Sequence, residues 1–131
     1  MQPIDVALLG GLGMVLWLAG TGYFAYRGYL LLGGNGVKLC AVFTLCPLAS
    51  TAVVVAILHW RAIAPANWAA AALLLAIPAM CGEALVLGRL QTFMPRLPTT
   101  SVGRYAALLF LTYALVLVAA EVVTLSSARP A

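Results

Sequence analysis

The 131-residue chain is 65% hydrophobic and only 8% charged, whereas soluble globular domains carry about 25% charged residues. This composition excludes a soluble domain and is typical of an integral membrane protein. The net charge of +4 comes from basic residues scattered singly at the ends of apolar segments, an arrangement that does not suit nucleic-acid binding.

Four apolar segments occupy most of the chain, and each is about 20 residues long. At a rise of 1.5 Å per residue, a helix of this length crosses a hydrocarbon core of about 30 Å. In chain order, we predict transmembrane helices over residues 6–27, 38–60, 68–92 and 103–125. They form a single integral membrane domain covering residues 1–131, because no room is left for a second, soluble domain.

Short connections join the predicted helices. Because short connections make neighbouring helices antiparallel, we expect an all-α, up-down bundle of four transmembrane helices with both termini on one side. The faces that carry the first and third connections hold five basic residues (Arg27, Lys38, Arg89, Arg96 and Arg104), against two on the opposite face (Arg61 and Arg129). By the positive-inside rule, this bias predicts a multi-pass protein of the cell inner (cytoplasmic) membrane with both termini on the outer, periplasmic side.

Stripes of small residues run along two of the predicted helices. In the first helix, Gly13 and Gly20 fall at spacings that place them on one face. In the third, Ala76, Ala79 and Glu83 share a face in the same way. Small residues let helix backbones approach closely in lipid. We therefore predict that the first and third helices meet through these stripes and that Glu83 faces the interior of the bundle.

Glu83 interrupts the third apolar segment, and a charge at the centre of a membrane helix costs about 3 kcal/mol on insertion scales. Such a charge needs a partner, a proton or a water-filled cavity. Arg27, at the end of the first helix, is the preferred partner, with Arg89 and Arg104 as rivals. Three hypotheses remain open: an ion pair that locks the bundle, a protonatable or cation-binding carboxylate, and contact with a lipid headgroup or a partner subunit. Glu121 lies near the outer end of the fourth helix, where we expect an interfacial charge.

Motifs for enzyme chemistry and metal binding are missing from the sequence. The three cysteines, Cys40, Cys46 and Cys81, form no CxxC pair, and His59 has no other histidine near it. The chain has three acidic residues in total, which leaves few groups for acid–base chemistry. We therefore expect no enzyme activity, no cofactor and no metal site.

Three stretches of the chain resemble a family of small four-helix bacterial inner-membrane proteins that is catalogued as a domain of unknown function. They are LWLAGTGYFAYRGYLLL at 16–32, PAMCGEALVLGRLQTFMPRLP at 78–98 and YAALLFLTYALVLVAA at 105–120. The likeness rests on an aromatic-x-Arg-x-x-Gly-like end to the first helix, which here resembles Phe24 to Arg27 and Gly28, and on a Gly-Met-x-x-acidic element before a Phe-Pro turn, which here resembles Met80 to Glu83 and Phe93 to Pro95. The resemblance implies the four-helix fold and the importance of Arg27 and Glu83, and it implies no activity.

These observations favour a small membrane binding or transport module. In it, the interior carboxylate of Glu83 either pairs with Arg27 or takes up a proton or a small cation. The alternative is a non-catalytic accessory subunit of a larger membrane complex. The lipid bilayer is the expected partner under both hypotheses, and nucleic acid is not expected as a partner. Because a bundle of this size encloses little volume, a homo-oligomer or a larger membrane complex is compatible with either hypothesis.

Overall fold

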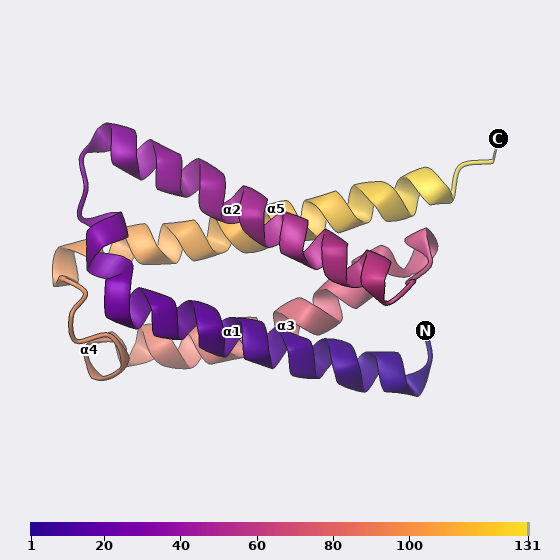
Figure 1. The fold of residues 1–131 in the computed structure, drawn as a ribbon, viewed down its shortest axis with the longest axis horizontal. Coiled ribbons are helices and arrows are strands. Elements are labelled where there is room, and N and C mark those ends of the chain that lie inside the picture. Colours follow the sequence, from indigo (N-terminus) through magenta and orange to yellow (C-terminus); the bar gives the residue numbers. More distant parts are fainter. Residues whose placement is uncertain (131) are drawn as a thin grey trace.

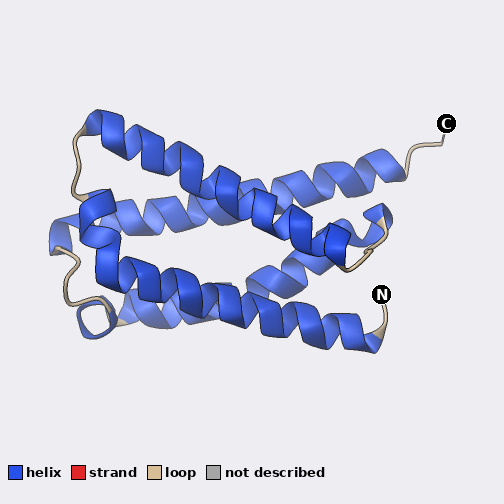
Figure 2. Cartoon of the chain, in the orientation of Figure 1, coloured by secondary structure: helices blue, strands red, loops and turns tan. Residues whose placement is uncertain are grey.

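The computed structural model describes residues 1–130, and it is built from helices joined by short connections (Figure 1). The four long helices are α1 (Pro3–Leu32), α2 (Gly36–Trp60), α3 (Trp68–Gly88) and α5 (Val102–Ser127). Three short segments lie in the connections: η1 (Pro65–Asn67), α4 (Leu90–Phe93) and η2 (Thr99–Ser101). Figure 2 shows helices and loops and no strand in residues 1–130.

Each of the four long helices is long and apolar enough to cross a membrane. The predicted all-α fold with four membrane-spanning helices is therefore confirmed. The chain is a multi-pass α-helical membrane protein.

The four long helices form a ring in which α1 packs against α3, α3 against α5, and α5 against α2. The remaining neighbours, α1 and α2, touch each other little. In Figure 1, α1 and α3 lie along one side of the bundle, α2 and α5 lie along the other, and both termini are at the same end. Because the chain reverses at each connection, α1 and α3 run in one direction and α2 and α5 in the opposite one. The edge between α1 and α2 is thus the loosely packed edge of the ring.

The closest approach of α1 and α3 occurs at Gly13. A Cβ atom built on Gly13 would overlap the backbone of Leu75, with its carbonyl carbon at 2.9 Å and its Cα at 3.0 Å. Ala76 and Ala79 of α3 are buried nearby, which suits an interface made by small side chains. Gly20 behaves differently, because nothing lies within 4 Å of the place where its Cβ would be. Gly13 therefore holds α1 against α3, and Gly20 does not.

Helix α3 ends at Gly88, although the hydropathy of the sequence predicts that it continues to residue 92. Arg89 leaves the helical conformation, with φ −137° and ψ 46°, and the short helix α4 begins at the next residue. The break turns Leu90, Met94 and Leu97 back under the bundle, where all three are buried. Burial of these side chains outweighs the further helical turn that the local sequence favours.

Polar contacts close the end of the bundle that carries both termini. Arg61, which follows α2 directly, donates through Nη2 to Asp5 Oδ1 of α1 in an ion pair of 2.7 Å. Asp5 Oδ2 also accepts a hydrogen bond from the backbone N–H of Gln2 at 2.9 Å, which caps α1 and starts the helix ahead of the predicted apolar segment. Thr124 Oγ1 of α5 accepts from the backbone N–H of Ala69 at 3.0 Å. These bonds tie α1 to α2 and α5 to α3.

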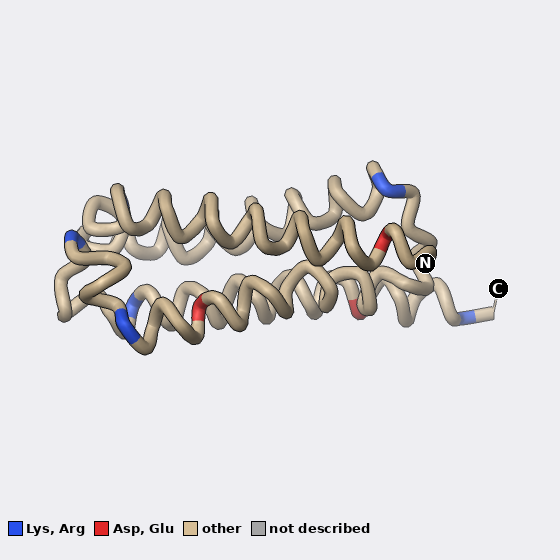
Figure 3. The backbone as a smooth tube through the Cα atoms, turned by 90° about the horizontal axis from the view of Figure 1, so that it is seen from below, with Lys and Arg blue, Asp and Glu red and all other residues tan. Residues whose placement is uncertain are grey.

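The basic residues lie toward the two ends of the bundle, and the middle of its length is almost free of them (Figure 3). At the end opposite the termini, Arg104 donates through Nη1 to the backbone carbonyl oxygen of Leu32 at 2.8 Å. This bond satisfies a carbonyl group at the C-terminal end of α1, which has no partner within the helix. The apolar middle of the bundle is left to face the membrane.

The packed interior divides into two apolar clusters. The cluster toward the termini consists of Leu9, Leu58, Ile63, Trp68, Ala71, Ala72, Leu75 and Ala120. The cluster toward the opposite end consists of Leu32, Val42, Val86, Leu90, Met94, Leu97, Tyr105 and Leu108. The space between them is only partly filled by side chains.

Candidate functional site

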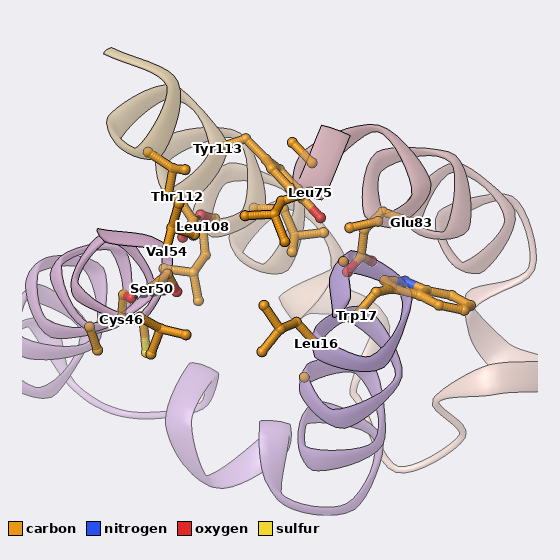
Figure 4. Close-up of a pocket in the computed structure, with 18 of the residues that line it drawn as sticks. Leu16, Trp17, Cys46, Ser50, Val54, Leu75, Glu83, Leu108, Thr112 and Tyr113 are labelled. Carbon is orange, nitrogen blue, oxygen red and sulfur yellow. Dashed lines mark hydrogen bonds between the residues drawn. The ribbon is translucent and has the colours of Figure 1, made fainter. Parts of the chain in front are cut away.

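A cavity of about 330 Å³ lies between the two apolar clusters, and all four long helices line it (Figure 4). Most of its wall is apolar: Gly13, Leu16, Gly20, Phe24, Ala49, Val53, Val54, Ala72, Leu75, Ala76, Ala79, Leu108, Leu109 and Val116. The remaining lining residues are Trp17, Cys46, Ser50, Glu83, Tyr105, Thr112 and Tyr113. An engineered protein cavity of about 150 Å³ holds a benzene molecule. This cavity therefore has room for a molecule with two fused rings.

Glu83 is the one charged side chain among the residues that line the cavity. Its side chain is 8% exposed, and its carboxylate points inward from α3 (Figure 4). Oε2 accepts a hydrogen bond of 3.0 Å from the hydroxyl group of Tyr105, a residue of α5 that is 1% exposed. A carboxylate has about four acceptor positions, and the described residues fill one of them. The cavity thus offers unused acceptors at a buried carboxylate.

Trp17 of α1 packs against Gly82, the residue before Glu83. A Cβ atom built on Gly82 would lie 2.6 Å from Cδ2 and from Cζ2 of the indole, so the ring occupies the space that any larger residue would need. The indole Nε1–H is buried and has no hydrogen-bond partner within residues 1–130. Trp17 and Glu83 both line the cavity (Figure 4). The cavity wall therefore carries an unused donor as well as unused acceptors.

Arg27, the predicted ion-pair partner, is not brought to Glu83. Within the described part of the chain, residues 1–130, the one ion pair within 4.0 Å is the pair of Asp5 with the arginine after α2. Arg27 is exposed near the end of α1, and its guanidinium carbon lies 5.4 Å from the ring centre of Tyr26. Glu83 is instead bonded to Tyr105. A neutral phenol at the depth of the carboxylate avoids the cost of drawing a guanidinium group into the membrane interior.

The secondary site candidates lie outside the cavity. Arg89 is exposed at the C-terminal end of α3, and Arg104 is exposed and bonded to the end of α1. Glu121 is exposed on α5 near the end that carries the termini. The four residues of the small-residue stripes, Gly13, Gly20, Ala76 and Ala79, do line the cavity. Of the acidic and basic residues that the sequence suggested for the site, Glu83 is thus the one that lines the cavity.

Tyr105 and Tyr113 are site residues that the sequence interpretation missed. Both line the cavity from α5, and they are eight residues apart, which places them on one helix face. A pair of hydroxyl groups at this spacing in an apolar helix is a signal that points to a polar interior. Tyrosines near the ends of membrane helices are common at the lipid interface, and that pattern hides the signal of Tyr105.

We expect Tyr105→Phe to lower the free energy of unfolding by about 1 kcal/mol, because a typical intramolecular hydrogen bond contributes about 0.5–1.5 kcal/mol. Unfolding in mixed detergent micelles, followed by circular dichroism, measures the change. In a double-mutant cycle, Tyr105→Phe and Glu83→Gln should be coupled. The matched cycle of Arg27→Ala with Glu83→Gln should be additive. Additive effects for Tyr105 and Glu83 would contradict the bond between them.

Residues 1–130 contain no group of three or more His, Cys, Asp or Glu side chains that could hold a metal ion. A protein family described as a family of unknown function (DUF5367) matches the chain over residues 30–127. The matched range includes the stretches 78–98 and 105–120 singled out in the sequence, and it excludes most of 16–32. No curated protein and no solved structure matches the chain.

Proposed function

This chain belongs to the family of unknown function DUF5367, and from its cavity we propose that it is a membrane-embedded binding protein for small, mainly apolar molecules that carry an amine. The observation that supports the proposal is a single buried carboxylate in an otherwise uncharged, mostly apolar cavity. Apolar walls with a few placed polar groups are the usual construction of small-molecule sites. The protein binds its ligand without changing it chemically.

The carboxylate favours an amine over a small metal cation. Ca²⁺ takes about six to eight oxygen ligands, and Mg²⁺ takes about six, whereas this cavity has one carboxylate and a few hydroxyl groups on its wall. An ammonium group needs fewer partners, and its bond to a carboxylate is short and strong where water is excluded. The unpaired indole N–H of Trp17 adds a donor for an acceptor atom close to the amine. A proton on Glu83 would take the place of the amine when no ligand is bound.

Two naphthalene compounds of nearly equal size test this proposal: 1-naphthylmethylamine, and 1-methylnaphthalene as its uncharged counterpart. Binding is measured as the rise in unfolding temperature of the purified protein in detergent with ligand concentration. We expect Glu83→Gln to weaken binding of the amine by about 10- to 100-fold, since charge-assisted hydrogen bonds contribute about 1.5–3 kcal/mol. Binding of 1-methylnaphthalene should stay the same.

Glu121→Gln is the matched control, because it makes the same change on an exposed part of α5 outside the cavity. It should leave the binding of both compounds unchanged. Equal affinity of the parent protein for the two compounds would remove the role of the carboxylate. If neither compound binds and a second membrane protein co-purifies in a fixed ratio, the accessory-subunit hypothesis replaces this one.

We also propose an orientation from the bias of the basic residues. The end with five lysines and arginines faces the cytoplasm, and the end with Arg61, Arg129 and both termini faces the periplasm. The membrane is the cell inner membrane. In this orientation, Glu83 lies in the cytoplasmic half of the bilayer.

A further inference from the structure

The cavity is exposed on one side of the bundle, between α1 and α2. Four of its lining residues are exposed, and they come from these two helices: Leu16 and Gly20 from α1, and Ala49 and Val53 from α2. All lining residues from α3 are buried, and those from α5 are buried or half-buried. The opening therefore coincides with the loosely packed edge of the helix ring.

This opening lies near the middle of the membrane. Leu16 and Gly20 are residues 14 and 18 of the 30 residues in α1, counted from Pro3. Ala49 and Val53 are residues 14 and 18 of the 25 residues in α2, counted from Gly36. At 1.5 Å per residue, all four lie within about 8 Å of the midpoints of their helices. Half of the hydrocarbon core is about 15 Å thick, so the opening faces lipid chains and not water.

We infer that the ligand enters this cavity sideways from the bilayer, through a portal formed by Leu16, Gly20, Ala49 and Val53. The ligands are therefore molecules that dissolve in the hydrocarbon core, which narrows the amine-bearing class to lipophilic amines that cross the membrane interior in their uncharged form. This inference rests on the proposed binding function.

Two small residues keep the portal open. Gly20 has no side chain, and nothing lies within 4 Å of the position of its Cβ, so a larger side chain there would extend across the opening without a clash. Ala49 lies on the other side of the portal, on α2, and is also exposed. Leucine at either position should narrow the portal and leave the packed side of the helix unchanged.

The probe is 4-bromo-1-naphthylmethylamine, whose bromine quenches tryptophan fluorescence. The part of the quenching that a Trp17→Phe variant loses, while it keeps Trp60 and Trp68, reports binding in the cavity. The protein is studied in lipid nanodiscs, and stopped-flow fluorescence gives the association rate while a titration gives the Kd. We expect Gly20→Leu and Ala49→Leu to slow association by about tenfold, within the ~1–3 decades over which association rates vary among mutants of one site. Val53→Ala, which widens the portal, should speed association.

Gly22→Leu is the matched control. Gly22 is an exposed glycine of the same helix, nothing lies within 4 Å of its Cβ position, and it does not line the cavity. This variant should bind the probe at the parent rate. If all the variants bind the probe as fast as the parent, the proposed entry route is wrong, and the proposed binding site is unaffected. If the parent protein does not bind the probe at all, the proposed function itself fails.

The proposed entry route would also be wrong if a second copy of the chain covered the exposed edge between α1 and α2. Light scattering of the nanodisc-free protein in detergent gives its mass, and the inference expects that Gly20→Leu does not change it. A parent protein that is dimeric, together with a monomeric Gly20→Leu variant, would show that the exposed α1 and α2 residues form a subunit interface and not an opening to lipid.

Discussion

Gly13→Ala will lower the free energy of unfolding by about 3 kcal/mol, at the upper end of the cost of overpacking a well-packed site. The added methyl group would overlap the backbone of Leu75, and a backbone cannot move aside as the end of a flexible side chain can. Helices α1 and α3 would have to separate along their contact. The measurement is unfolding in mixed detergent micelles, followed by the loss of helical circular dichroism.

Gly10→Ala provides the control for this prediction. Gly10 lies one turn earlier on α1, and nothing is within 4 Å of its Cβ position. Since alanine is favoured over glycine inside helices by about 1 kcal/mol, this variant should be neutral or slightly more stable than the parent. Equal effects of the two substitutions would show that the close approach at Gly13 does not hold the helices together.

The second large effect is expected for Gly82→Ala, which should cost about 2–3 kcal/mol because its methyl group would meet the indole of Trp17. The cavity that Trp17 lines gives the ring space to move away from α3. We therefore expect weaker binding of 1-naphthylmethylamine as well as lower stability. A shift in the fluorescence of Trp17 would report the displacement of the ring directly.

Trp17→Leu tests whether the cost of Gly82→Ala arises from this contact. The smaller side chain makes room for the new methyl group, so the double variant should be more stable than the sum of the two single effects predicts. Gly88→Ala is the control on the same helix, since nothing lies within 4 Å of its Cβ position. Strict additivity of the Gly82 and Trp17 substitutions would contradict the steric explanation.

The number and type of the long helices could be predicted from the sequence because a single physical requirement fixes both. In lipid, backbone polar groups must bond within their own segment, so apolar segments of this length form helices. The break at Arg89 could not be predicted in this way. It depends on burial of Leu90, Met94 and Leu97 against residues distant in the chain, and hydropathy along the sequence does not contain that contact.

The partner of Glu83 shows a second limit of the sequence. Spacing along the chain gives the depth of each residue in the membrane. Arg27 was predicted as the partner because it and Glu83 lie near the same membrane face. The choice between Arg27 and Tyr105 depends also on which helix faces Glu83 and how its side chain is turned. That information is set by the packing of α3 against both α1 and α5, which the spacing of apolar residues does not specify.

The loose edge between α1 and α2 is fastened at both of its ends. At one end, the short connection at residues 33–35 joins the two helices, and at the other, Arg61 is paired with Asp5 at 2.7 Å. Pro47 lies in α2 between these points and removes one backbone hydrogen bond there, so bending of this helix is easier. We expect α1 and α2 to separate at mid-length while their ends stay in place. A ligand can then pass between them, and the contacts at the two ends of the helices are kept.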